Sequence, residues 1–377
     1  MIKRTISAQI TEAITTPNRA IILYGPRQAG KTTLIQSLFK QKSGNHEELF
    51  FNGDDLFAQD LFSRNELEAL SRIVGSNKIV VIDEAQRIAN IGLTLKLLVD
   101  NLPVTVIASG SASFELADKI NEPLTGRTKT FWLYPLSWKE VSGQYSKTMR
   151  KTALEEMLRF GMYPKVHSLS AREKADYLYE YLNNYLYRDL LTFESIRKPK
   201  KVVDLLVLLA LQIGKEVSIA ELAKHLAVNQ KTIESYLDIL VKMFILVNLR
   251  GFSRNLRKEI YKTSKYYFTD TGLRNALIRN FNPLNIRADA GELFENWFIM
   301  EKIKHMSNSR QYANFYFWRT YDQQEIDLIE EKEGRLTGYE CKLSTKKKFA
   351  PPRDWLASYK TAGFKTVHAE NCFGFLE

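Results

Sequence analysis

The sequence predicts an α/β protein whose first part is a parallel sheet carrying a P-loop, followed by a winged-helix module and a smaller α/β domain. Residues 20–24 form an apolar run that leads into a glycine-rich loop at 25–32, and residues 33–39 then have apolar side chains at helical spacing. Two further apolar runs, at 78–82 and 104–108, end in polar residues. Continuous apolar strands are typical of a parallel sheet that helices cover on both faces.

The loop at residues 25–32 reads G-P-R-Q-A-G-K-T, a complete phosphate-binding P-loop between a strand and a helix. Gly25 and Gly30 let the backbone curl, so that its N–H groups and the helix N-terminus point at phosphate oxygens. We expect Lys31 to reach the β- and γ-phosphates and the Thr32 hydroxyl to bind Mg²⁺. The residues expected to contact the nucleotide are Gly25, Pro26, Arg27, Gln28, Ala29, Gly30, Lys31, Thr32 and Thr33.

The apolar run at 78–82 is followed by two carboxylates, as in a Walker B strand. We expect Asp83 to bind Mg²⁺ largely through water, because this ion gives up its hydration shell reluctantly. Glu84 is then free to orient and polarise the attacking water. The alternative is a polar strand end without a catalytic role.

Ser111 is the candidate for a sensor of the γ-phosphate, because it lies in the polar residues 109–111 that follow the strand at 104–108. This role requires that strand to lie between the P-loop strand and the Walker B strand. The alternative is that Ser111 or Ser113 caps a helix at 114–120.

Arg127 precedes another strand, at 128–134, and is a candidate for an arginine that reaches the γ-phosphate of a neighbouring subunit. That role implies a homo-oligomer. The alternative is a surface arginine that pairs with a local carboxylate.

Composition describes a globular protein of two or three domains. The chain has 377 residues, 45% of them hydrophobic, and a mean hydropathy of -0.28. The N-terminus lacks an apolar core for a signal peptide, and the most apolar stretch, 202–213, is too short to span a bilayer. Cys341 and Cys372 lack metal-ligand spacing. We therefore expect a cytoplasmic protein with no membrane partner.

Positive charge is concentrated in one segment. The formal net charge is +11, and residues 197–265 contain 14 Lys or Arg and 6 Asp or Glu, a net charge of +8. A concentrated basic region indicates a polyanionic partner such as DNA or another nucleic acid. Solubility is the alternative reason for such a surface.

The same segment predicts a winged helix-turn-helix. Apolar spacing indicates helices at 200–214, 218–226 and 230–244, and strands at 245–249 and 266–268 flank a basic loop. In such a module the second helix of the turn enters the major groove and the wing touches phosphates. The alternative is a rigid spacer or a protein-docking module. The residues expected to contact DNA are Lys231, Thr232, Ser235, Arg254, Arg257 and Lys258.

The C-terminal part holds a second set of candidate residues. Glu295 lies in a helix predicted to start with residues 291–298. Asp327 and Glu340 lie on predicted strands, and Lys342 faces the same side of its strand as Glu340. Carboxylates at adjacent strand ends can share a divalent cation, with Lys342 orienting water or stabilising phosphorane charge. This set predicts a metal-dependent phosphodiesterase with a second divalent-cation site. The alternative is a paired-charge network on an inactive fold.

These motifs together resemble the prokaryotic AAA-type ATPases of the AAA_14/DUF4143 family. The resemblance covers nearly the whole chain and implies an AAA-like ATPase fold and a C-terminal domain with a PD-(D/E)xK nuclease-like fold. Two positions depart from the family pattern: Ser-Gly-Ser-Ala replaces Thr-Gly-Ser-Ser, and Glu-Cys-Lys replaces Glu-Val-Lys. The motifs that carry it are G-P-R-Q-A-G-K-T-T-L, V-V-I-D-E-A-Q-R, S-G-S-A, L-T-G-R, Y-F-T-D-T-G-L, E-I-D and E-C-K.

We expect a P-loop AAA-type ATPase domain at 1–140, a helical connector at 141–199, the winged helix at 200–285 and the nuclease-like domain at 286–377. The leading hypothesis is a protein that binds ATP and hydrolyses it with Mg²⁺, and whose nucleotide state controls a winged-helix and nuclease-like module acting on nucleic acid. The alternatives are a nucleotide-dependent protein-interaction switch with an inactive nuclease-like domain, and an ATP-regulated metal-dependent nuclease.

Overall fold

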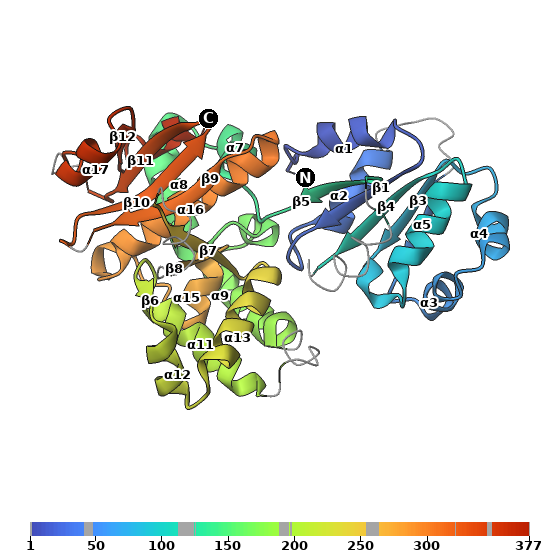
Figure 1. Cartoon of the computed structure of the whole chain (residues 1–377), viewed down its shortest axis with the longest axis horizontal. Coiled ribbons are helices and arrows are strands. Elements are labelled where there is room, and N and C mark those ends of the chain that lie inside the picture. The colour runs from blue at the N-terminus through green and yellow to red at the C-terminus, as the bar shows by residue number, and fades with distance from the viewer. Residues whose placement is uncertain are drawn as a thin grey trace. The chain divides into compact units, whose positions relative to one another are not determined.

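The computed structural model describes residues 2–40, 48–111, 124, 126–187, 196, 198–253, 264–320, 322–344 and 349–376. The chain forms two compact units, one of residues 1–135 with 242–244 and one of residues 136–241 with 245–377 (Figure 1). Each unit contains one sheet. Among the described residues, no helix has both the length and the hydrophobicity needed to cross a membrane.

The first unit contains the predicted parallel sheet, with strand order β2-β3-β4-β1-β5. All four pairings between neighbouring strands are parallel. The third strand of the prediction, β4, lies between the P-loop strand β1 and the Walker B strand β3, as the sensor role requires. The loop after β1 and the acids after β3 therefore meet at the same edge of the sheet, where ligands bind in open α/β sheets. The strands are β1 (Arg19–Tyr24), β2 (Glu48–Asn52), β3 (Ile79–Asp83), β4 (Thr105–Gly110) and β5 (Thr128–Trp132).

Helices cover both faces of this sheet, as Figure 1 shows. They are α1 (Ser7–Ile14), α2 (Lys31–Lys40), α3 (Leu56–Ser63), α4 (Leu67–Val74) and α5 (Ile91–Asn101). Ile21 and Leu23 of β1 pack in a buried cluster with α1 and α2. Ala20 and Ile22 point to the opposite face and pack with α3, α4 and α5. Because both faces are covered, β1, β3 and β4 are apolar along almost their whole length.

The second unit is built on a seven-stranded sheet with order β12-β11-β10-β9-β7-β8-β6. Its strands are β6 (Glu216–Val217), β7 (Leu246–Gly251), β8 (Ser264–Phe268), β9 (Asn314–Arg319), β10 (Glu325–Lys332), β11 (Arg335–Cys341) and β12 (Gly363–Val367). Parallel pairing of β7 with β9, through Arg250–Tyr316 and Gly251–Phe317, joins the hairpin of the basic segment to the C-terminal strands. The two predicted parts thus share one sheet.

The helices of the second unit are α7 (Trp138–Val141), α8 (Arg150–Phe160), α9 (Ala171–Tyr181), α11 (Pro199–Leu211), α12 (Ile219–Leu226), α13 (Gln230–Lys242), α15 (Thr271–Leu277), α16 (Ala290–Ser309) and α17 (Arg353–Ser358). Helices α11, α12 and α13 lie close to the positions that apolar spacing predicts. A capping hydrogen bond from the Glu221 N–H to the Ser218 hydroxyl (3.3 Å) starts α12. The helix expected at 114–120 lies outside the described residues.

The four-part division of the sequence differs from the two compact units. The boundaries expected near residues 199 and 285 fall inside the second unit. The physical reason is the β7–β9 pairing, because strands that share a hydrogen-bonded sheet also share its core. Phe252, which follows β7, packs with Trp318 of β9 and Trp355 of α17 in one buried cluster.

Candidate nucleotide-binding site and C-terminal charge cluster

The P-loop has the backbone geometry that requires glycine at two positions. A Cβ at Gly25 would lie 2.2 Å from the carbonyl oxygen of Leu133, so no larger residue fits. Gly30 has a φ of 96°, in the region that disfavours side chains. Lys31 is buried, and its Nζ donates to the carbonyl oxygens of Gly25 (2.9 Å) and Pro26 (3.2 Å). The lysine therefore lies against its own loop, where phosphates are expected.

Asp83 lies between two hydroxyl groups at the carboxyl edge of the sheet. Thr32 donates its hydroxyl to Oδ2 of Asp83 at 2.5 Å, and the buried Ser109, on β4, donates to Oδ1. Hydroxyl and carboxylate oxygens are ligands that Mg²⁺ prefers. Because the Thr32 hydroxyl and the Asp83 carboxylate already lie within hydrogen-bond distance of each other, these two oxygen ligands fit a magnesium ion.

A glutamine connects the proposed catalytic carboxylate to the proposed sensor. The side-chain Nε2 of Gln86 donates to Oε2 of Glu84 (2.6 Å) and to the Ser111 hydroxyl (3.1 Å). Gln86 lies on the short 3₁₀ turn Ala85–Arg87 and is buried. Glu84 itself has a left-handed backbone with φ 49°. Gln86 and Ser109 were missed as site residues, although both lie inside the motifs that carry the resemblance.

Arg127 lies at the amino edge of the sheet, opposite the P-loop. Its carbonyl accepts a hydrogen bond from the N–H of Ala20 (3.0 Å) at the start of β1, whereas the P-loop follows the end of that strand. The strand length separates the two by roughly 16 Å. The half-exposed Arg127 side chain pairs with Asp100 at the end of α5, which is the local ion pair of the alternative interpretation. A role toward a neighbouring subunit stays a prediction.

Three of the six candidate DNA-contacting residues lie on the first two turns of α13. Lys231 and Ser235 are exposed and Thr232 is half-buried. Asn229 caps this helix, because its Oδ1 accepts hydrogen bonds from the N–H (2.7 Å) and the hydroxyl (2.8 Å) of Thr232. The other three candidates, Arg254, Arg257 and Lys258, lie outside the described residues.

The C-terminal candidates come from one helix and two neighbouring strands. Glu295 lies on α16, Asp327 on β10 and Glu340 on β11, and Lys342 follows the end of β11. Lys342 pairs with Glu340 at 2.7 Å. Asp327 accepts a hydrogen bond from the N–H of Cys341 at 2.7 Å. The structure thus places all four in the same part of the unit, with one direct contact between them.

Two residues of β8 complete this cluster. Tyr267 donates its hydroxyl to Oε1 of Glu295 at 2.5 Å. The ammonium group of Lys265 forms an ion pair with Glu325 and lies 3.7 Å from Oε1 of Glu295. Lys265 is only 2% exposed. Neither residue was singled out from the sequence, because Lys265 ends the predicted basic loop and Tyr267 lies on the predicted strand at 266–268, and nothing local shows that β7 joins this hairpin to the C-terminal strands.

Burial and mutual repulsion raise the pKa values of these carboxyl groups. Burial, followed by the nearby Asp327 charge, raises the pKa of Glu295 to about 8 and that of Glu340 to about 7. Burial also raises the pKa of Asp327, although Lys342 and Lys265 act in the opposite direction. Burial lowers the pKa of Lys265, but the surrounding carboxylates outweigh it and keep the lysine charged. The positive charge in the cluster therefore comes from lysines.

This arrangement does not support the predicted second divalent-cation site. Within the described ranges, no three His, Cys, Asp or Glu side chains lie together so as to hold a metal ion. Glu340 turns one oxygen to Lys342, and Lys265 faces Glu295 and Glu325. The physical reason is that two ammonium groups offset the carboxylate charge that a cation would otherwise neutralise.

Comparison with known proteins agrees with the motifs. Residues 17–142 match the AAA domain family, residues 151–284 match a domain of unknown function (DUF8612), and residues 290–368 match the domain of unknown function DUF4143. An uncharacterized protein of Mycobacterium tuberculosis is 29% identical over 351 residues, which cover 91% of this chain and 74% of the relative. An uncharacterized protein of Methanocaldococcus jannaschii is 26% identical over 351 residues, covering 88% of this chain and 77% of the relative.

A Walker-type ATPase of Pyrococcus abyssi has a similar fold, with a TM-score of 0.53 and 16% identity, covering 74% of this chain and 96% of that one. The predicted α/β fold with a P-loop ATPase sheet and a second sheet toward the C-terminus is confirmed. The chain therefore combines an AAA domain at residues 17–142 with a C-terminal DUF4143 domain at residues 290–368, the two families that its motifs resemble.

Proposed function

We propose that this protein is a cytoplasmic ATPase that hydrolyses ATP with Mg²⁺, and that its nucleotide state controls a nucleic-acid-binding second unit. The observation that carries the ATPase proposal is the hydrogen bond between Thr32 and Asp83, beside the Glu84–Gln86–Ser111 chain. The AAA family match and the Walker-type ATPase with a similar fold support it.

Each side chain has a separate role in this mechanism. Lys31 leaves its own loop carbonyls to meet the β- and γ-phosphates. Thr32 and Asp83 would hold Mg²⁺, which would supply positive charge to neutralise the charge that develops on the phosphates. Glu84 orients the attacking water and accepts its proton, and Gln86 keeps that carboxylate in place while also reaching Ser111.

Nucleic acid is the proposed partner of the second unit. Its basic segment contains α11, β6, α12, α13, β7 and β8 in that order, which is the element order of a winged helix. The antiparallel pairs β7–β8 and β6–β8 supply the hairpin that this module needs. The exposed Lys231 and Ser235 at the start of α13 lie where such a module reads a major groove.

The charge cluster favours a C-terminal domain that binds without cutting. Lys265 and Lys342 offset the carboxylates, so Asp327 and Glu340 need no cation to offset their repulsion. This supports the alternative of a nucleotide-dependent interaction switch with an inactive nuclease-like domain over an ATP-regulated nuclease. The same switch could bind protein instead of nucleic acid, and the salt dependence of binding separates these two partners.

The decisive experiment is ATP turnover by the full chain with and without duplex and single-stranded DNA, with Lys31→Ala as the background control. Stimulation by DNA, together with binding that weakens steeply as salt rises, supports the nucleic-acid role because phosphate contacts release counterions. If neither duplex nor single-stranded DNA changes ATP turnover, and DNA binding depends only weakly on salt, the protein-interaction switch is favoured. No turnover above the Lys31→Ala background would refute the ATPase proposal.

A further inference from the structure

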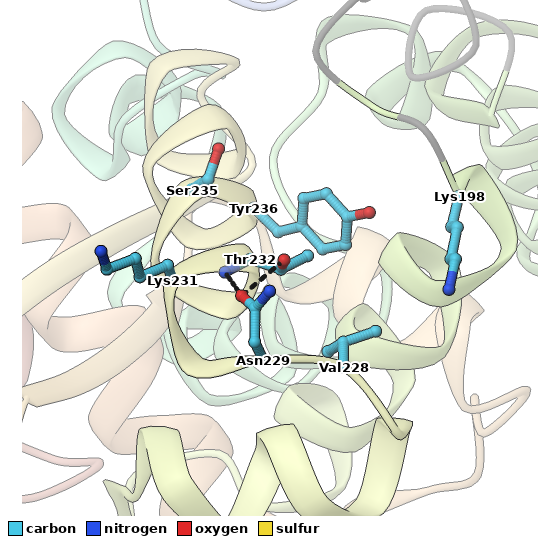
Figure 2. Close-up of a pocket in the computed structure, with 7 residues that line it drawn as sticks. All are labelled: Lys198, Val228, Asn229, Lys231, Thr232, Ser235 and Tyr236. Atoms are coloured by element: carbon cyan, nitrogen blue, oxygen red, sulfur yellow. Dashed lines mark hydrogen bonds between the residues drawn. The ribbon is translucent and has the colours of Figure 1, made fainter.

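A cavity of about 450 Å³ lies beside the amino-terminal turns of α13, next to the start of α11. Figure 2 shows its lining side chains, which come from the connection before α13, from α13 itself and from the residue before α11. A cavity of a few hundred Å³ is large enough for a small ligand or one nucleotide unit. The lining residues are Lys198, Val228, Asn229, Lys231, Thr232, Ser235 and Tyr236.

The lining is rich in hydrogen-bond donors and contains no acidic residue. Lys198 and Lys231 each carry an ammonium group, and within the described part of the chain neither has a carboxylate partner. Thr232, Ser235 and Tyr236 add three hydroxyl groups. Figure 2 shows Lys231 extending to the side of α13 opposite to Lys198, so Lys198 and the Thr232 and Tyr236 hydroxyl groups are the donors that favour an anionic ligand with several acceptor oxygens.

Tyr236 gives an independent sign of a ligand. Its side chain is only 3% exposed, yet it lines the cavity, and Figure 2 shows its ring extending from α13 toward the side on which Lys198 lies. No hydrogen-bond partner for its hydroxyl occurs among the residues that the structure describes. The hydroxyl oxygen is not among the fully buried polar atoms that lack a partner, so it is open to the cavity and can donate to a ligand that enters it.

Helix geometry adds to the attraction for an anion. Lys198 and Asn229 are the residues that immediately precede α11 and α13, so two helices of 13 residues begin at this cavity. The amino end of each helix carries partial positive charge from its aligned peptide dipoles. Asn229 already caps α13, and the remaining contribution of the helix ends adds to the positive charge of Lys198.

We infer that this cavity binds a phosphate ester, held by Lys198 and by the Tyr236 hydroxyl. The phosphate can belong to a nucleic-acid strand or to a free mononucleotide, and the chemistry of recognition is the same for both. The nucleic-acid source rests on the proposed function, and the mononucleotide source does not. Lys198 and Tyr236 lie outside the helix face predicted to read the major groove, so the cavity adds a contact that groove reading does not require.

The test measures binding of three probes to the full chain: a 5′-phosphorylated single-stranded oligonucleotide, a duplex, and thymidine 5′-monophosphate. The monophosphate is offered to Lys31→Ala protein, so that the P-loop does not contribute. Loss of oligonucleotide binding in the cavity variants without monophosphate binding assigns the site to nucleic acid. Loss of both assigns it to phosphate esters in general.

Two variants and one matched control make the test specific. Lys198→Gln and Tyr236→Phe should each weaken probe binding, Lys198→Gln by about tenfold because it removes a charge-assisted contact. Lys200→Gln removes the same charge from an exposed position two residues away on α11 that does not line the cavity, and should weaken binding less than about twofold. Thermal unfolding of each variant checks that the fold is retained.

Equal weakening by Lys198→Gln and Lys200→Gln would overturn the inference, since it would indicate a general electrostatic surface. Unchanged affinity of Tyr236→Phe for every probe, or no binding of any probe to the parent proteins, would also overturn it. If DNA stimulates the ATPase but Lys198→Gln and Tyr236→Phe do not weaken probe binding more than Lys200→Gln does, the proposal for the cavity is refuted and the nucleic-acid role is not. If the cavity variants weaken monophosphate binding but DNA does not change turnover, the nucleic-acid role is refuted and the phosphate-binding cavity is still supported.

Discussion

Thr32 donates its hydroxyl to the carboxylate of Asp83 at 2.5 Å, although the two residues are 51 positions apart in the sequence. The contact exists because β1, β4 and β3 run parallel, so that the P-loop after β1 and the Walker B acids at the end of β3 lie at the same edge of the sheet. Ser109 of β4 contacts the same carboxylate from this middle strand. The helix after β1 and the strands β3 and β4 thus each place one polar group around the expected magnesium position.

Substitutions of Lys31 and Glu84 should have different effects on ATP binding and on turnover. Lys31→Ala should abolish nucleotide binding or hydrolysis, because Lys31 is the cation that the P-loop holds for the β- and γ-phosphates. Glu84→Gln should retain ATP affinity while turnover falls by about 10²-fold or more, since it removes the base for the attacking water. ATP titration and single-turnover kinetics measure the two effects. Equal loss of ATP affinity in both variants would contradict this division of roles.

Gln86 should act as a positioning residue for Glu84. Gln86→Ala removes the amide that bridges Glu84 and Ser111, and turnover should fall roughly tenfold while ATP affinity stays the same. Gln36→Ala, an exposed position on α2, is the matched control and should leave turnover unchanged. A parallel loss of ATP affinity in Gln86→Ala would mean that Gln86 holds the loop rather than the carboxylate.

Local sequence signals predicted the strands of the first sheet better than the partners of its polar side chains. Apolar runs indicated β1, β3 and β4, whereas the position of β4 between the other two was only a condition of the sensor role, which the structure meets. The bridging role of Gln86 had no such signal, because a hydrogen bond to Ser111 depends on how two strand ends approach in space. Lys265 was missed for the same reason, since its partner Glu325 lies 60 residues away.

Arg127 provides a test of assembly. If it serves a neighbouring subunit, Arg127→Ala should lose turnover, and mixing it with Lys31→Ala protein should restore part of it, because a mixed interface combines an intact P-loop with an intact arginine. Asp100→Asn removes only the ion pair with Arg127 and should leave turnover intact. Turnover strictly proportional to protein concentration down to a demonstrated monomer would rule out the role in a neighbouring subunit.

Glu295 should make stability depend on pH. Its pKa is raised to about 8 in the fold and is near 4.3 in an unfolded chain, so the folded state holds the proton more tightly. The resulting stability is fully present below the unfolded pKa and is lost as pH rises through about 8. Glu295→Gln cannot titrate but can still accept from Tyr267, so its Tm relative to the parent protein should increase between pH 5 and pH 9. A constant difference in Tm across that range would contradict the raised pKa.

Lys265 should replace a metal ion as the source of positive charge in the C-terminal cluster. Lys265→Met leaves Glu295, Glu325 and Asp327 without their buried ammonium group, and we expect a loss of roughly 3 kcal/mol in the free energy of unfolding near pH 8. The loss should shrink toward pH 5, because carboxyl groups with raised pKa values then take up protons.

The matched control for Lys265 is Lys332→Met, at the end of β10, where the lysine donates to Gln311 (2.8 Å) near the surface. This change should alter stability by no more than about 0.5 kcal/mol. Chemical denaturation of the full chain, followed through the second unit, gives both values.

Millimolar Mg²⁺ should leave the stability of the second unit unchanged in the parent protein, since the lysines already offset the carboxylate charge. The opposite result, Mg²⁺-dependent cleavage of DNA that disappears in Asp327→Ala, would show that the carboxylates rearrange around a cation and that the lysines serve the chemistry of a nuclease.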